Sequence, residues 1–155
     1  MTDMSTSKNR RIVVGTDPQG RSVVLSDARD MAESHPGKVA IEEVWWQPQI
    51  PFRPEQGLAS RAGEVEIEPP SSGAVVRLLS VPPLSDGQEW VLDLHFDDAL
   101  HVITLTSGAL DIVLETEEVS LEVGDSIVLP GSMHDLRNLG QVPATFVYTS
   151  FPLSR

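Results

Sequence analysis

The strongest constraint on the fold is a succession of short apolar or alternating segments, separated by turn signals, that fills the chain from residue 64 onward. Proline pairs and glycines fall between these segments. Many short strands with regular punctuation are typical of a β-sandwich, a jelly roll or a closed barrel, and no long amphipathic helix competes with them. The sequence therefore predicts an all-β fold, with strands at 64–68, 74–81, 90–97, 101–106, 109–115, 119–123, 126–129 and 145–151.

The N-terminal third is less regular. Residues 11–16 and 21–26 read as a hairpin around a turn that Asp17 and Pro18 open and Gly20 closes. Residues 28–38 predict one short helical turn that ends before Pro36, and residues 41–46 look extended. Several prolines and glycines make 47–63 a long loop, and residues 1–10 form a polar, aperiodic tail. Apart from that tail, we expect a single domain over 11–155.

Composition excludes several classes of protein. The formal net charge of −12 argues against nucleic acid and anionic membranes, because phosphate contacts need basic patches. The chain has no cysteine, which excludes disulfides and thiolate metal sites. No apolar run reaches the length of a membrane span or the core of a secretory signal, so we expect a cytoplasmic protein.

Three of the four histidines cluster in the C-terminal half. They are His95 and His101, with Asp97 between them, and His134 in a segment rich in glycine and proline signals. Imidazole and carboxylate are the side chains that bind Zn, Fe, Mn or Ni in proteins. The pattern favours a metal pocket inside a small barrel.

At these residues the chain resembles the cupins, which are small jelly-roll barrels also described as double-stranded β-helices. Their second motif, G-x5-P-x-G-x2-H-x3-N, is matched by Gly124, Pro130, Gly131, His134 and Asn138, with one residue missing between Pro130 and Gly131. Their first motif is matched by position. The two His places hold His95 and Asp97, the Glu place holds His101, the final Gly place holds Gly108, and the leading Gly place holds Glu89.

The resemblance covers residues 64–151 and implies a cupin-type barrel with extra N-terminal strands. It implies a divalent metal ion (Zn, Fe, Mn or Ni) bound by His95, Asp97, His101 and His134, and a homodimer. The spacing permits such a site, because residues two apart on a strand point the same way. A turn through residues 98–100 would return His101 on the adjacent strand.

Two other interpretations of these residues stay open. In a plain half-buried strand, Asp93, His95 and Asp97 would face solvent while the alternate apolar residues face the core. Alternatively, the same side chains line a pocket without metal. Arg77 is either an exposed strand residue or a pocket residue that holds a substrate carboxylate or enolate. Asp98, or Asp97 if it is not a ligand, is a candidate general base, and a solvated turn carboxylate is the alternative for Asp98. Aromatic residues could also line the pocket or pack in the core, namely Trp45, Trp46, Trp90, Phe146 and Tyr148.

Three functions remain compatible with the sequence. The first, which we favour, is a non-redox cyclase, isomerase or dehydratase that acts on a hydrophobic metabolite, because the chain is similar to small cupins of natural-product pathways. The second is an Fe(II)-dependent dioxygenase, and the third is a cupin that binds a small ligand without converting it. The fold alone does not choose among them.

Overall fold

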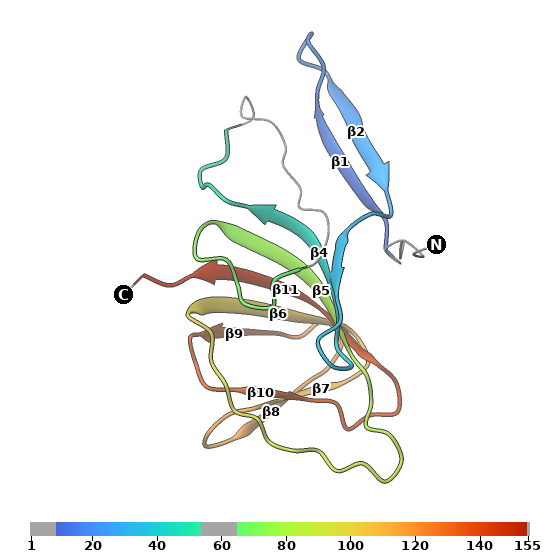
Figure 1. Ribbon diagram of the computed structural model, residues 1–155, viewed down its shortest axis with the longest axis vertical. Coiled ribbons are helices and arrows are strands. Elements are labelled where there is room, and N and C mark those ends of the chain that lie inside the picture. Colours follow the sequence, from blue (N-terminus) through green and yellow to red (C-terminus); the bar gives the residue numbers. More distant parts are fainter. Residues whose placement is uncertain (1–8, 54–64, 155) are drawn as a thin grey trace.

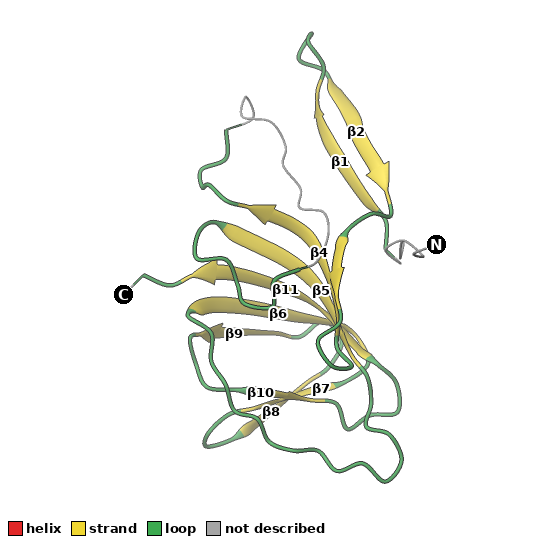
Figure 2. Cartoon of the chain, viewed as in Figure 1, coloured by secondary structure: helices red, strands yellow, loops and turns green. Residues whose placement is uncertain are grey.

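The computed structural model describes residues 9–53 and 65–154, and these residues form strands, turns and loops without a helix (Figure 2). Within this part of the chain, therefore, no helix is long and apolar enough to cross a membrane. The strands are β1 (Arg11–Thr16), β2 (Ser22–Ala28), β3 (Ala32–Ser34), β4 (Ala40–Gln47), β5 (Ala74–Val81), β6 (Ala99–Ser107), β7 (Leu110–Val113), β8 (Glu118–Leu121), β9 (Ser126–Pro130), β10 (Asp135–Arg137) and β11 (Ala144–Pro152).

The strands pair in three antiparallel sheets. A six-stranded sheet has the order β3-β4-β5-β11-β6-β9, a three-stranded sheet has the order β10-β7-β8, and β1 pairs only with β2. The three-stranded sheet lies below the six-stranded sheet, and the β1–β2 hairpin extends away from both (Figure 1). The last strand, β11, lies between β5 and β6 and pairs with both, so strands that are distant in sequence are neighbours in the sheet.

The core forms where the inward residues of the two larger sheets meet. Along β6, residues 99, 101, 103 and 105 are buried and alternate with residues that face outward. Ile103 and Leu105 pack with Phe146 of β11 and with Leu110 and Ile112 of β7, all at most 1% exposed. Burying one such side chain contributes about 1.5–3 kcal/mol, so this cluster is what holds the two sheets together.

The predicted all-β jelly roll is confirmed, with one correction. In the residues that the structure describes, the two larger sheets face each other as separate ladders and do not join into one closed barrel. The N-terminal hairpin is also confirmed. Gly20 N donates to Asp17 O (2.9 Å), and the Asp17 carboxylate accepts hydrogen bonds from Gln19 N and Arg21 N, which fixes the turn.

Three predicted elements are wrong. Residues 28–38 form no helical turn, because Met31 and Ala32 are buried and β3 pairs with Glu43, Glu42 and Ile41 of β4. Residues 65–68 are not a strand, and residues 90–97 contain one isolated bridge, between His95 and His134. No pattern in the sequence predicts β10. The predicted tail and most of the predicted 47–63 loop lie outside the described residues.

Candidate functional site

The second cupin motif builds the turns that bring His134 to the site. Gly124 (φ 97°) lies in the turn between β8 and β9, and Pro130 ends β9. Gly131 (φ 70°) adopts the left-handed conformation that favours glycine and donates its N–H to Ala99 O. Asn138 is buried, and its amide donates to Val81 O and Val142 O and accepts from Gly140 N. This amide therefore ties β5 to the loop before β11.

His95 and His134 face each other across a single antiparallel bridge. His95 N donates to His134 O (3.0 Å), His134 N donates to His95 O (2.9 Å), and the ring centroids are 4.9 Å apart. The Nδ1 atom of His95 lies 2.8 Å from Asp93 O, and that of His134 lies 2.7 Å from Ser132 O. A carbonyl only accepts, so each Nδ1 carries a proton, and in the neutral form of the ring Nε2 then keeps a free electron pair.

His101 and Asp97 form the second half of the cluster. His101 is buried on β6, and its Nε2 lies 2.8 Å from Asp97 Oδ2 and 3.1 Å from the hydroxyl of Tyr148 on β11. Its Nδ1 is also buried and has no hydrogen-bond partner among the described residues. The ring centroids of His101 and His134 are 6.1 Å apart, so the two halves adjoin each other.

The surroundings set the protonation states of this cluster. The hydrogen bond from His101 lowers the pKa of Asp97, so this carboxyl is ionised at neutral pH. Burial lowers the pKa of His134 and thereby favours its neutral ring, and burial raises the pKa of Tyr148, which keeps the phenol protonated. The site thus combines an anionic acceptor, the neutral imidazole of His134 and a phenolic donor.

Most of the cluster, though not His101, lies in the wall of a cavity of about 420 Å³ between the two larger sheets. His95, Asp97, His134 and Tyr148 line it together with Arg77, and most of the remaining wall is aliphatic, including Val39, Ile41, Leu79, Ile103 and Leu136. A small number of polar groups in a mainly apolar cavity is the usual form of a small-molecule site. The structure thus brings His95, Asp97 and His134 to the wall of one cavity.

The sequence allows Arg77 to be an exposed strand residue or a pocket residue. The structure favours the pocket residue, because Arg77 is only 2% exposed and lines the cavity. Its Nη atoms donate to Ile67 O (3.0 Å) and Glu66 O (2.8 Å), and one of them lies 3.4 Å from Glu43 Oε1. Its Nε is buried and has no partner among the described residues. Arg77 therefore fixes the segment that carries Ile67, which itself lines the cavity.

The other candidates are placed less favourably. Asp98 is exposed and does not line the cavity, so the structure gives no geometric support to its predicted role as a base. The predicted turn through residues 98–100 is wrong, because β6 begins at Ala99 and His95 pairs with His134 instead of a β6 residue. Trp90 stacks against Arg137, whose Cζ is 5.0 Å from the ring centroid, and Phe146 belongs to the core.

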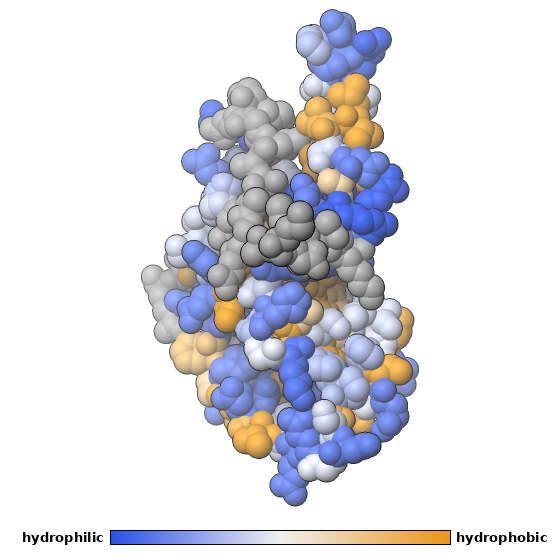
Figure 3. All heavy atoms as spheres, turned by 45° about the vertical axis from the view of Figure 1, so that its right-hand side comes forward, coloured by the Kyte–Doolittle hydropathy of each residue, from blue (hydrophilic) through white to orange (hydrophobic). Residues whose placement is uncertain are grey.

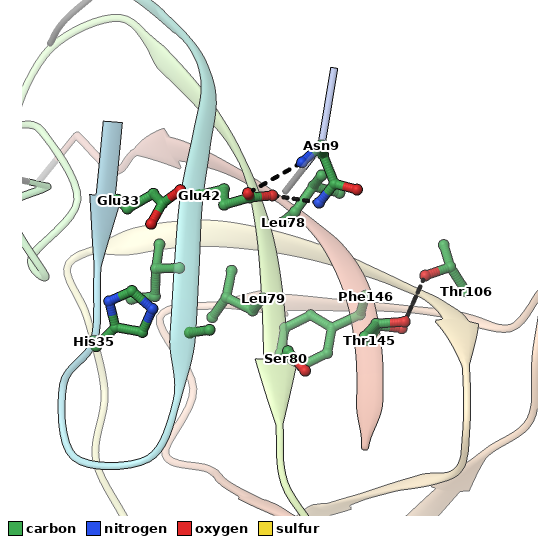
Figure 4. Close-up of a pocket in the computed structure, with 12 residues that line it drawn as sticks. Asn9, Glu33, His35, Glu42, Leu78, Leu79, Ser80, Thr106, Thr145 and Phe146 are labelled. Atoms are coloured by element: carbon green, nitrogen blue, oxygen red, sulfur yellow. Dashed lines mark hydrogen bonds between the residues drawn. The ribbon is translucent and has the colours of Figure 1, made fainter. Parts of the chain in front are cut away.

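A second hollow of about 460 Å³ lies at the ends of β3, β4, β5 and β11 (Figure 4). Its polar residues include Glu33, His35 and Glu42, and the Glu42 carboxylate accepts hydrogen bonds from Asn9. It shares only Ile41 and Leu79 with the cavity described above, so His35 takes no part in the histidine cluster.

The clustered side chains are of the kinds that bind a divalent metal, but their positions in this structure are not those of a set of metal ligands. Two free imidazole Nε2 atoms, a third imidazole and an ionised carboxylate are ligands that Zn²⁺ and related ions accept. The Nδ1–H to carbonyl bonds of His95 and His134 are the kind that orient ligating imidazoles. As the side chains of the described residues stand, however, no group of three or more His, Asp or Glu could hold a metal ion. Binding would require His101 to exchange its hydrogen bond with Asp97 for the metal.

Tyr148 is the site residue whose polar role sequence reasoning missed. It was expected only as an apolar pocket or core residue. The available signal was the spacing of Phe146, Tyr148 and Ser150, which are two residues apart on the final strand and therefore share one face. That face is the inward one once β11 is known to pair with β6.

Comparisons with known proteins agree with the architecture. No protein-family model matches the sequence, and no curated protein matches it. A Salmonella typhimurium protein provisionally described as ethanolamine utilization protein Q is 14% identical, with a TM-score of 0.50 over 97% of this chain and 99% of that chain. KdgF from Halomonas sp. is 15% identical, with a TM-score of 0.49 over 75% of this chain and 80% of that chain.

An RmlC-like cupin with a double-stranded β-helix fold, from Methanocaldococcus jannaschii, is 14% identical, with a TM-score of 0.43 over 51% of this chain and 70% of that chain. Likenesses at this level of identity speak for the fold and leave activity open. The chain therefore shares its fold with the Salmonella typhimurium protein, and its facing antiparallel sheets form the jelly roll that the resemblance to the cupins implies.

Proposed function

We propose that this cupin is a small-molecule enzyme of the cytoplasm, a non-redox cyclase, isomerase or dehydratase acting on a hydrophobic metabolite of a natural-product pathway. One observation carries the proposal. Imidazoles, an ionised carboxylate and a buried phenol gather on one wall of a cavity whose other walls are mainly aliphatic. Such a cavity binds the apolar body of a substrate and places its oxygen atoms at the polar wall.

The proposal includes a divalent metal ion bound by His95, Asp97, His101 and His134. When bound, such an ion supplies Lewis acidity toward a substrate carbonyl or hydroxyl. The free Nε2 atoms of His95 and His134 support this assignment, and His101 and Asp97 would join them by exchanging their mutual hydrogen bond for the ion.

The chain's own groups have distinct roles in this chemistry. Tyr148, whose phenol burial keeps protonated, donates a hydrogen bond to a substrate oxygen. Asp97, where it is not engaged by the metal, accepts a proton from the substrate in place of Asp98. Arg77 fixes the Glu66–Ile67 backbone at the cavity and leaves its Nε for an acidic oxygen of the substrate.

The first test is the metal content of protein purified without an affinity tag, measured by elemental mass spectrometry. We expect nearly one divalent ion per chain in the wild type and its loss in His134→Ala. His35→Ala is the matched control, because His35 is exposed and lies outside the cluster, and this variant should retain the metal.

A wild-type protein without metal after incubation with Zn²⁺, Mn²⁺, Ni²⁺ and anaerobic Fe²⁺ would contradict the metal-dependent mechanism. The hydrogen bond between Asp97 and His101, with the Tyr148 hydroxyl 3.1 Å from the same His101 Nε2, would then favour a second candidate, a metal-free pocket that uses these groups as acid and base. Bound iron with substrate-dependent oxygen consumption would select a dioxygenase instead.

A further inference from the structure

Arg77 carries a positive charge inside the protein that its partners only partly neutralise. On the face of the molecule shown in Figure 3, polar side chains cover much of the surface, where water solvates them. Arg77 is only 2% exposed, and among the described residues that line the cavity of about 420 Å³ it is the only Lys or Arg. Two of its partners, Glu66 O and Ile67 O, are neutral, and the third, Glu43 Oε1, lies 3.4 Å from Nη2. A charge-assisted hydrogen bond is normally about 2.7–2.9 Å long, so this ion pair is a loose one.

The Nε atom of Arg77 is a hydrogen-bond donor without an acceptor. It is buried, and no described residue accepts from it. Buried donors in native proteins are nearly always satisfied, so such a group indicates a missing partner. Because Arg77 lines the cavity, a ligand there is the natural source of the acceptor. The guanidinium presents its donors in a fixed fork that matches the two oxygens of a carboxylate.

Tyr148 supplies a second donor beside Arg77. The two residues are register partners on β11 and β5, and both line the cavity. Burial raises the pKa of Tyr148 and the charge of Arg77 opposes that rise, so the guanidinium lies near the phenol. The ionised Asp97 accepts the Nε2–H of His101, and this nitrogen then has no electron pair for the phenol 3.1 Å away. The Tyr148 O–H is therefore left to donate to a ligand oxygen.

The carboxylates of the cavity come from segments other than those of Arg77 and Tyr148. Asp93 and Asp97 belong to the 90–98 segment and Asp135 begins β10, whereas Arg77 and Tyr148 lie on the six-stranded sheet. Like charges repel, so these carboxylates direct an anionic headgroup toward Arg77. They would instead attract the headgroup of an amine.

The apolar part of the cavity is aliphatic. Its walls include Val39, Ile41, Leu79, Val81 and Ile103, and no Trp or Phe of the described residues lines it. Aromatic side chains offer ring faces on which planar ligands stack. Their absence from the described wall favours a ligand with a saturated, three-dimensional body.

We propose that the ligand of this cavity is an aliphatic monocarboxylic acid, whose carboxylate is bound by Arg77 Nε and the Tyr148 hydroxyl. This inference rests on the proposed small-molecule function and names its substrate class. It is independent of the metal, because neither donor belongs to the four predicted metal ligands. The carboxylate supplies the acceptor that Nε lacks and the negative charge that Glu43 supplies only in part.

Isothermal titration calorimetry of the metal-free full chain at neutral pH tests the headgroup. The probes share one body and differ in charge: cyclohexanecarboxylate, cyclohexanecarboxamide and protonated cyclohexylmethylamine. We expect the carboxylate to bind roughly tenfold tighter than the amide, because its hydrogen bonds are charge-assisted, and the amine to bind more weakly than either. Removing metal ensures that the carboxylate is not held by an ion.

Two variants connect the binding to Arg77. Glu43→Gln keeps the volume of the side chain and removes the competing charge, so the carboxylate should bind roughly threefold tighter or more, with the amide unchanged. Arg77→Lys keeps the charge and loses Nε, so carboxylate binding should weaken roughly tenfold. Glu42→Gln is the matched control, because Glu42 is the neighbour of Glu43 but lines the other hollow, and its affinity for the carboxylate should equal that of the wild type.

Several results would overturn the proposal. They are equal binding of carboxylate and amide, tighter binding of the amine, no binding of the carboxylate at millimolar concentration, and an unchanged affinity in Glu43→Gln. The comparison of probes and Glu43→Gln leave Arg77 in place, so they decide the matter even where Arg77→Lys does not fold. A chain that binds the carboxylate but never takes up a metal ion would uphold this ligand class and contradict the metal-dependent function.

Discussion

At the scale of single residues, the site depends on side chains that form hydrogen bonds with backbone N–H and C=O groups that no neighbouring strand pairs. Asp93 N donates to the Asp135 carboxylate (3.0 Å), and the carbonyls of Glu66 and Ile67 accept from Arg77. Both segments were predicted as strands because their side chains alternate. Alternation reports which side chains share a face, but it does not say whether a neighbouring strand or a distant side chain satisfies the backbone.

The protonation of His134 gives a pH prediction at the same scale. Burial lowers its pKa in the folded protein below the ordinary value of 6.5, so the unfolded chain binds more protons than the folded one below that pH. The stability of metal-stripped protein should therefore fall as the pH drops below 6.5, until it passes the lowered pKa.

Thermal unfolding between pH 7.5 and 5 measures this effect. In His134→Gln, whose side chain does not titrate, the fall in melting temperature over this interval should be smaller than in the wild type. His35→Gln is the control and should follow the wild-type profile. An unchanged pH dependence in His134→Gln would contradict the assignment.

At the scale of elements, the turn between β6 and β7 combines two constraints on Gly108. Its φ of +79° lies in the left-handed region, and a Cβ there would approach Pro143 O to 2.6 Å and Ala144 Cα to 3.0 Å. Backbone atoms at the start of β11 cannot move aside without disturbing the sheet. Gly108 is also the last residue of the first cupin motif, which gives a physical reason for glycine at that place.

Gly108→Ala should therefore destabilise the fold by roughly 3 kcal/mol, of which the left-handed conformation accounts for about 1–2 kcal/mol. Gly20→Ala is a matched control, because its φ is +76° and no atom lies within 4 Å of the added Cβ. Urea denaturation of both variants separates the two costs. Equal losses of stability would show that the close approach to Pro143 has no energetic weight.

Sequence reasoning succeeded for elements that local chemistry specifies. The Asp17–Gly20 turn, the alternation along β6 and the positive-φ glycines around β9 are determined within a few residues. It failed for β3, whose three residues are a strand only because β4 lies beside them. The four predicted metal-site residues do meet in space, but the carbonyl partners of His95 and His134 and the role of Tyr148 depend on tertiary pairing.

At the scale of the whole molecule, the charge of −12 predicts how the homodimer that the resemblance to the cupins implies should respond to salt. Copies of like charge repel one another, and the Debye length falls from about 30 Å at 0.01 M to about 10 Å at 0.1 M. The dimer should therefore become tighter as NaCl increases over this range. Sedimentation equilibrium at several salt concentrations measures the dissociation constant, and weakening by salt would instead indicate an interface held by ion pairs.

The single bridge between His95 and His134 has a consequence for how this protein can change. Residues 90–98 are joined to the second-motif segment by the two backbone hydrogen bonds of this bridge and by the bond from Asp93 N to the Asp135 carboxylate, and the six-stranded sheet does not include residues 90–98. His95 and Asp97, which form half of the polar wall, can therefore be replaced by substitutions in this loop while the sheets that hold the cavity stay intact. For protein engineering, residues 90–98 are a segment that can be replaced as a unit, to introduce ligands for another metal or another acid–base pair.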